Sequence, residues 1–172
     1  ITDQPVKLVI NENGQGHAIL GNSYWSQLGV DILAHEEAIH EIEENSYTIL
    51  ERMKSYNRDK AVGTEVVIPN KSFSEKIIFN LGGLEFHVLH LGPAHGPGDT
   101  QVLLPQLSLM IAGDMAFHER MLPIFENTCT KCWLETWDEK FAPLNATYVI
   151  PGHGHPTKMA QVTRFTRDYL KD

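Results

Sequence analysis

Three short motifs, far apart along the chain, each place a histidine or an aspartate directly after a strand-like apolar run. His95 lies in the loop GPAHGPGD, Asp114 ends the run LMIAGD, and His153 ends the run YVIPGH. In a layered α/β protein the ends of neighbouring strands meet at one edge of a sheet, so these three side chains are expected to converge. Imidazole and carboxylate groups are ligands of hydrolytic transition-metal sites. The motifs therefore predict an α/β fold with a metal site at a sheet edge.

The hydrophobic periodicity predicts alternating strands and helices in the first third of the chain and a run of strands in the middle. Apolar residues at helical spacing opposite an acidic face indicate a long amphipathic helix over 35–56. A hairpin turn is expected at 80–83, and Thr157 is expected to cap the last helix. The predicted strands are 6–11, 30–34, 65–68, 75–79, 84–90, 100–104, 107–112 and 147–150; the predicted helices are 22–28, 35–56, 130–144 and 157–170.

Length and composition favour one soluble globular domain over residues 1–172, because 42% of the residues are hydrophobic and 21% are charged. The net charge of −8 argues against nucleic-acid and membrane partners, which are bound through clusters of Lys and Arg. No apolar run has the length of a membrane span. The compartment, periplasmic or secreted on one side and cytoplasmic on the other, stays open.

The only two cysteines, Cys129 and Cys132, have the spacing of a redox pair or of half a zinc site. No second cysteine pair accompanies them, and no thioredoxin-type unit surrounds them. The segment instead has the pattern of the start of an aromatic-rich helix that contains Trp133 and Trp137. We therefore interpret the two cysteines as structural residues.

The order and spacing of the motifs resemble the metallo-β-lactamase superfamily, whose members are mostly hydrolytic metalloenzymes with a four-layer αββα sandwich. The resemblance runs from Val6 to the end of the chain. It implies an α/β, metallo-β-lactamase-like sandwich. The segments that carry it are Val9–Asn11, Gly21–Tyr24, Gly92–Gly98, Gly113–Asp114 and Pro151–Gly154.

The resemblance breaks down in the loop that follows the first strand. Family members have His-x-His-x-Asp-His there, but this chain has ENGQGHA over residues 12–18. If His17 takes the place of the final histidine, the two earlier histidines fall on Glu12 and Gly14. If the register is held from the Gly21–Asn22 pair, the loop positions become Asn13, Gln15, His17 and Ala18. In both registers His17 is the one good metal ligand left in the loop.

The resemblance implies a reduced metal site. His17, Asp114 and His153 would hold one metal, while His95 and Asp114 are what remains of the other position. Two imidazoles and a carboxylate suit a catalytic zinc ion, with iron or no metal as the alternatives. The implied activity is attack by metal-bound hydroxide on an ester, thioester, lactone or amide bond of a small-molecule substrate, with Asp114 as the catalytic carboxylate. The alternative is a metal-free binding module on the same fold.

Further residues are expected to surround this site. His90 is expected to orient His95, Asp99 to accept a hydrogen bond from a ligand histidine, and His118 to contact substrate or an additional metal. The remaining histidines are expected to be solvated or to lie behind the site. They are His35, His40, His87 and His155.

The family fold opens with strands and a helix that would precede Ile1, so the sandwich is expected to be N-terminally truncated. Such a truncation exposes a sheet edge and an apolar face. We therefore expect a homo-oligomer, or a preceding segment of the protein, to cover that face.

Overall fold

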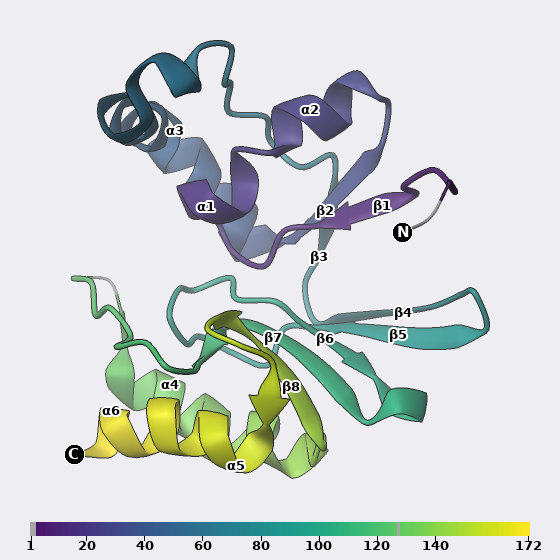
Figure 1. Ribbon diagram of the computed structural model, residues 1–172, viewed down its shortest axis with the longest axis vertical. Helices are drawn as coiled ribbons and strands as arrows, with labels where there is room; N and C mark the ends of the chain where they lie inside the picture. Colours follow the sequence, from purple (N-terminus) through teal and green to yellow (C-terminus); the bar gives the residue numbers. More distant parts are fainter. Residues whose placement is uncertain (1–2, 127) are drawn as a thin grey trace.

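Two β-sheets pack face to face, and helices cover the outer face of each (Figure 1). The computed structural model describes residues 3–126 and 128–172. Apolar side chains from both sheets fill the space between them, including Leu33, Phe73, Val88 and Leu104. The layer order is therefore αββα, which confirms the fold class predicted from the sequence.

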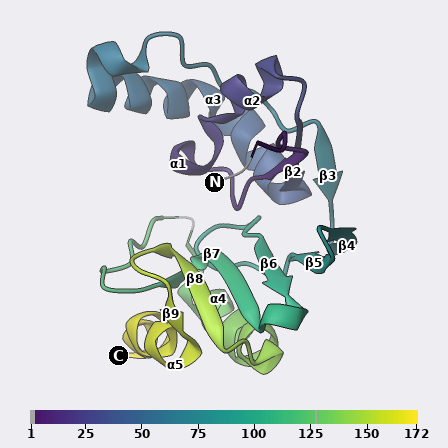
Figure 2. The same ribbon diagram turned by 45° about the vertical axis from the view of Figure 1, so that its right-hand side comes forward.

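The first sheet has three parallel strands in the order β1-β2-β3. Parallel strands need crossover connections, and helices supply them here. Figure 2 shows the chain leaving this sheet along one side of the molecule, from β3 to β4. The elements of this half are β1 (Leu8–Ile10), α1 (Gly16–Ile19), α2 (Asn22–Gln27), β2 (Asp31–His35), α3 (Glu36–Asn57), the 3-10 turn η1 (Arg58–Ala61) and β3 (Lys71–Phe73).

The second sheet has six strands in sequence order. All its neighbouring strands are antiparallel except β7 and β8, which run parallel. The strands are β4 (Lys76–Leu81), β5 (Leu84–Leu89), β6 (Gln101–Leu104), β7 (Leu109–Phe117), β8 (Tyr148–His153) and β9 (Thr157–Lys158). The helical segments are η2 (Pro105–Leu107), α4 (Thr130–Thr136), η3 (Trp137–Phe141), η4 (Ala142–Leu144), α5 (Met159–Val162), η5 (Thr163–Asp168) and α6 (Tyr169–Lys171).

A second apolar core lies between the six-stranded sheet and the helices of the C-terminal half. Trp133, Trp137 and Phe141 are at most 1% exposed in it, as their helical spacing predicted. They lie on one continuous helical segment, which passes from α4 into the π-helical η3 and ends at η4. Several residues of the long strand β7, which carries Asp114, pack in this core.

Helix α3 begins at Glu36 because the side chain of His35 accepts a hydrogen bond from the backbone N–H of Glu37. Acidic residues in its first turn complement the positive end of the helix dipole. Ala38 and Ile42 are completely buried and hold the N-terminal half of the helix against the sheet. The helix then projects beyond the sheet (Figure 1).

Two secondary-structure predictions, one strand and one helix cap, are wrong. Residues 65–68 do not form a strand, since the carbonyl of Val67 accepts a hydrogen bond from the Asn22 side chain and Pro69 has no N–H to donate. Thr157 does not cap the terminal helix. It pairs with Val149 in the sheet, and Lys158 holds the cap position of α5.

Cys129 and Cys132 form a disulfide, a pairing that our structural interpretation of these residues did not include. The Cys129 sulfur also accepts a hydrogen bond from the backbone N–H of Cys132. The pair therefore closes the turn that begins α4, where the sequence predicted a helix start.

Among the described residues, no helix is both long enough and apolar enough to cross a membrane. The single-domain organisation over 1–172 and the expected cover over the first sheet stay predictions.

Gly98 lies where its loop touches α3, and a Cβ at this position would overlap the backbone of Ala38. Gly98→Ala is expected to destabilise the fold by about 2 kcal/mol, because neither backbone can move without disturbing the core. Urea unfolding measures this effect. Gly96→Ala, in the same loop, is the control: its Cβ would make ordinary contacts of 3.7 and 3.8 Å, and its cost should stay within about 1 kcal/mol. Equal stabilities of the two variants would contradict the close approach.

Candidate metal centre

The carboxylate of Asp114 is the centre of the candidate site. It lies on β7, is 1% exposed, and is approached from both halves of the molecule. The His17 Nε2 lies 3.3 Å from its Oδ2, and the His153 Nε2 lies 3.4 Å from its Oδ1. One ligand atom from each of these three residues lies within 4.8 Å of the other two. This spacing could accommodate a metal ion.

His95 joins the same cluster at a slightly longer distance, with its Nε2 3.8 Å from Asp114 Oδ2. Its ring is 1% exposed and contacts the rings of Phe117, Phe125 and Trp133. Burial lowers the pKa of His95 and so favours the neutral imidazole. The structure therefore brings together the four residues predicted to form the site.

Interactions within this cluster shift the pKa values of His17 and Asp114. The hydrogen bond with Asp114, helped by a second one with Glu12, raises the pKa of His17 to about 10. Burial acts to raise the pKa of Asp114, but the hydrogen bond with His17 and the nearby imidazoles outweigh it and lower that pKa. Without metal, the His17 imidazolium supplies the positive charge that the buried carboxylate needs. The position is therefore one that favours a cation.

Glu12 is a residue of the site that the sequence analysis missed. Its Oε2 accepts a hydrogen bond of 2.7 Å from the backbone N–H of Asp114, and its Oε1 lies 3.2 Å from His17 Nε2. Its carbonyl accepts a 2.6 Å hydrogen bond from the Thr100 N–H, which ties the loop to the second sheet. A carboxylate in a glycine-rich loop directly after a strand was the available signal.

Two side-chain amides of the glycine-rich loop lie near the site. That of Asn13 lies next to Asp114, and that of Gln15 lines the neighbouring cavity. Asn13 is completely buried, and its Nδ2 donates to Asp114 Oδ2 at 3.3 Å. Its Oδ1 accepts from the backbone N–H of Gln15, whose half-buried side chain lines the cavity. This arrangement favours the register held from Gly21 and Asn22, in which Asn13 and Gln15 replace the family's first two histidines.

Asp99 is 1% exposed and supports the loop of His95 from behind. Its Oδ2 accepts a 2.8 Å hydrogen bond from the Gly96 N–H rather than from a ligand histidine, which differs from our expectation. Its Oδ1 is buried and has no hydrogen-bond partner among the described residues. Burial raises the pKa of Asp99 well above its usual range.

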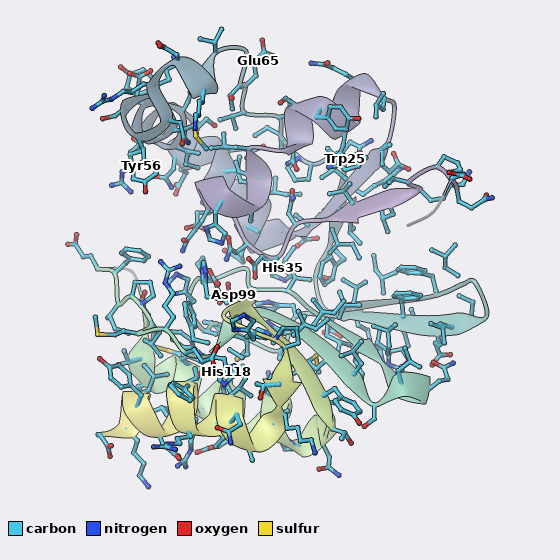
Figure 3. The ribbon with its side chains drawn as sticks, viewed as in Figure 1. Trp25, His35, Tyr56, Glu65, Asp99 and His118 are labelled. Carbon is cyan, nitrogen blue, oxygen red and sulfur yellow. A yellow bond between two sulfur atoms is a disulfide. The ribbon has the colours of Figure 1, made fainter. Side chains whose placement is uncertain are left out.

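His90 and His35 form a stacked pair behind the site, with ring centroids 3.7 Å apart. His90 Nδ1 bonds to the Asp99 carbonyl, so it does not orient His95 as we expected. His35 bonds to the Ser74 carbonyl and is 5% exposed, so of the two expected placements it lies behind the site and not in solvent (Figure 3). It is the last residue of β2, and its ring also packs edge-on against Phe73.

His118 lies on the far side of the strand ends, towards the terminal helices (Figure 3). Its Nδ1 is 2.9 Å from the His155 carbonyl, and its ring packs edge-on against Phe165. It therefore braces the loop that follows β8, where we expected it to contact substrate or metal. His155 points into solvent beside Glu119, as predicted.

Arg120 is a second residue of the site that the sequence analysis missed. Its Nη1 lies 3.1 Å from His153 Nδ1, and an arginine can only donate in such a contact. In this arrangement Nε2 of His153 carries the proton that faces Asp114. Cation binding through Nε2 therefore requires the proton to move to Nδ1 and Arg120 to turn away.

A cavity of about 870 Å³ opens beside His17. The glycine-rich loop and α1 form one wall, one face of α3 forms another, and Phe125 and Glu126 border it. Its volume is typical of small-molecule sites.

Comparison with known proteins gives one family and one fold. The model of the metallo-beta-lactamase superfamily matches residues 19–155, starting just after the degenerate loop. A metallo-beta-lactamase from Pontibacter korlensis has 20% identity and a TM-score of 0.80, over 98% of this chain and 71% of that chain.

Two further structures have the same fold. The metallo-beta-lactamase IND-7 has 19% identity and a TM-score of 0.70, over 99% of this chain and 70% of that chain. The stereoselective inverting sec-alkylsulfatase Pisa1 from Pseudomonas sp. has 17% identity and a TM-score of 0.67, over 99% of this chain but 32% of its own. No curated protein matches the chain.

The raised pKa of Asp99 predicts a pH-dependent difference between the wild type and Asp99→Asn. Folding favours the protonated acid, so its contribution to stability is full below the unfolded pKa and is lost as the pH rises towards the folded pKa. Asn keeps an acceptor for the Gly96 N–H and cannot ionise. In metal-free protein, the melting temperature of Asp99→Asn minus that of the wild type should increase from pH 4 to pH 8. A constant difference would show that folding does not raise the pKa of Asp99.

Proposed function

The chain belongs to the metallo-β-lactamase superfamily, and from this premise we propose that it is a metal-dependent hydrolase with a single metal ion. His17, Asp114 and His153 would hold the ion. The observation that carries the proposal is the convergence of their ligand atoms within 4.8 Å, from three separate segments of the chain. The buried Asp114 Oδ1, which has no hydrogen-bond partner among the described residues, supports the fit of a cation there.

The donor set favours zinc, because two imidazoles and one carboxylate leave open positions for catalysis. The same set also suits ferrous iron. A second ion is disfavoured because Asn13 and Gln15 are neutral amides and His95 is then the only imidazole available to it. The Asn13 side chain also turns its N–H₂ group, a donor, towards Asp114.

The bound ion would supply a Lewis acid and an activated water at neutral pH. The chain supplies the rest. Glu12 holds Asp114 through its backbone N–H and so fixes the carboxylate. His95, kept neutral by burial, lies where it could hydrogen-bond to a reacting oxygen next to Asp114. The cavity beside His17 would hold the substrate, for which we propose an ester, thioester, lactone or amide of a small molecule.

A metal-free binding module is the second candidate, and one observation favours it. His17 pairs with both Glu12 and Asp114, so the buried carboxylate is neutralised without any ion. In this case a chelator would leave both stability and ligand binding unchanged. The metal content of the purified protein therefore distinguishes the two candidate functions.

Purified wild-type protein is expected to contain about one zinc ion per chain, and Asp114→Asn and His153→Ala should contain almost none, because each removes one of three ligands. Elemental analysis measures this content. EDTA should lower the melting temperature of the wild type, since a metal that binds only the folded state stabilises it. His155→Ala, two residues after His153 and exposed, is the control and should keep its metal. A metal-free wild type that EDTA does not affect would favour the binding module.

The register that places Asn13 and Gln15 at the two lost histidine positions predicts a gain of metal. The double variant Asn13→His with Gln15→His should bind about two zinc ions per chain, because His95 and the two new imidazoles complete a three-histidine site. Equilibrium dialysis against zinc measures the stoichiometry. Replacing Glu12 and Gly14 by His instead tests the other register, and a gain with that pair alone would show that our register is wrong.

A further inference from the structure

The cavity beside the candidate metal centre is lined by both polar and apolar side chains. His17 and Glu41 line it at the end next to the centre. Between Glu41 and Arg52 the lining combines the apolar side chains of Leu20 and Ile49 with the polar side chains of Asn45 and Thr48. This distribution suits a ligand that has an alkyl segment between two polar groups.

One face of α3 forms the long wall of the cavity. Its lining residues recur at helical spacing, from Glu41 through Ile49 to Arg52 and Tyr56. The rise of 1.5 Å per residue places Arg52 about 16 Å along the helix axis from Glu41. A ligand that reaches from the centre to Arg52 therefore needs an extended chain of medium length.

Arg52 is the one Lys or Arg side chain among the described residues that line the cavity. It makes no ion pair or side-chain hydrogen bond with any residue in 3–126 or 128–172. Its neighbour Lys54 does form an ion pair, 3.0 Å from Glu51. An unpaired guanidinium at the border of a cavity can bind a carboxylate through two parallel hydrogen bonds.

We propose that the cavity binds the acyl chain of an ester or thioester whose far end carries a carboxylate, and that Arg52 binds this carboxylate. The inference rests on the proposed hydrolase function, since it places the scissile carbonyl beside Asp114. Hydrolysis adds one water across the bond between the acyl carbon and the leaving oxygen or sulfur. The products are a dicarboxylic acid, which loses its protons at neutral pH, and an alcohol or thiol.

Calorimetric titration with sebacate, a ten-carbon dicarboxylate, tests the assignment of Arg52. Arg52→Gln should weaken sebacate binding about tenfold or more, because it removes a hydrogen bond to a charged group. Binding of dimethyl sebacate, which has the same chain but no charge, should be unchanged. Lys54→Gln is the matched control on the same helix and should bind both compounds as the wild type does. Equal sebacate affinities of wild type and Arg52→Gln would overturn the proposal.

Hydrolysis of the mono-p-nitrophenyl ester of sebacic acid separates this inference from the proposed function. Arg52→Gln should raise the KM for this ester about tenfold and leave kcat unchanged, because Arg52 contacts the substrate far from the bond that breaks. No hydrolysis, with sebacate binding that still depends on Arg52, would overturn the hydrolase and leave a dicarboxylate-binding site. Hydrolysis with a KM that does not depend on Arg52 would keep the hydrolase and overturn this inference.

Discussion

The burial of the Asp114 carboxylate is the constraint on which the site depends. A charged group with 1% exposure is costly unless cationic or hydrogen-bonding partners surround it. Here the partners come from three directions: His17 from α1, His153 from the end of β8, and Glu12 through the backbone N–H of Asp114. The glycine-rich loop must therefore cross from the first sheet to the second. The need to surround the buried Asp114 carboxylate with partners therefore shapes both the path of this loop and the site.

The sequence predicted the convergence of the site because it follows from strand-end geometry, whereas the four layers were what the resemblance to the superfamily implied. The long amphipathic helix lies within one residue of its predicted start and end, at Glu36–Asn57. The local hydrophobic pattern gave a wrong strand where a side chain distant in sequence bonds to a backbone carbonyl. The segment 65–68 has strand-forming residues, but the Asn22 side chain takes the Val67 carbonyl. No local pattern could indicate that contact.

The roles of single side chains were harder to predict than their positions. Glu12 and Arg120 act through the backbone N–H of Asp114 and the Nδ1 of His153, contacts that depend on the exact path of two loops. His90, Asp99 and His118 all lie near the strand ends as expected, yet each bonds to backbone groups that hold the loops in place. Spacing predicts which residues gather, but the direction of a ring or a carboxylate depends on its packing.

The two halves of the candidate centre come from opposite sheets. His17 belongs to the three-stranded sheet's side of the molecule, whereas Asp114 and His153 are carried by strands of the six-stranded sheet. An ion held by all three residues would link the two halves of the molecule. Its release would leave the glycine-rich loop joined to the second sheet through Glu12, Asn13 and His17, whose contacts with Asp114 and Thr100 need no ion. The cavity wall that this loop forms would therefore be held less tightly when the centre is empty.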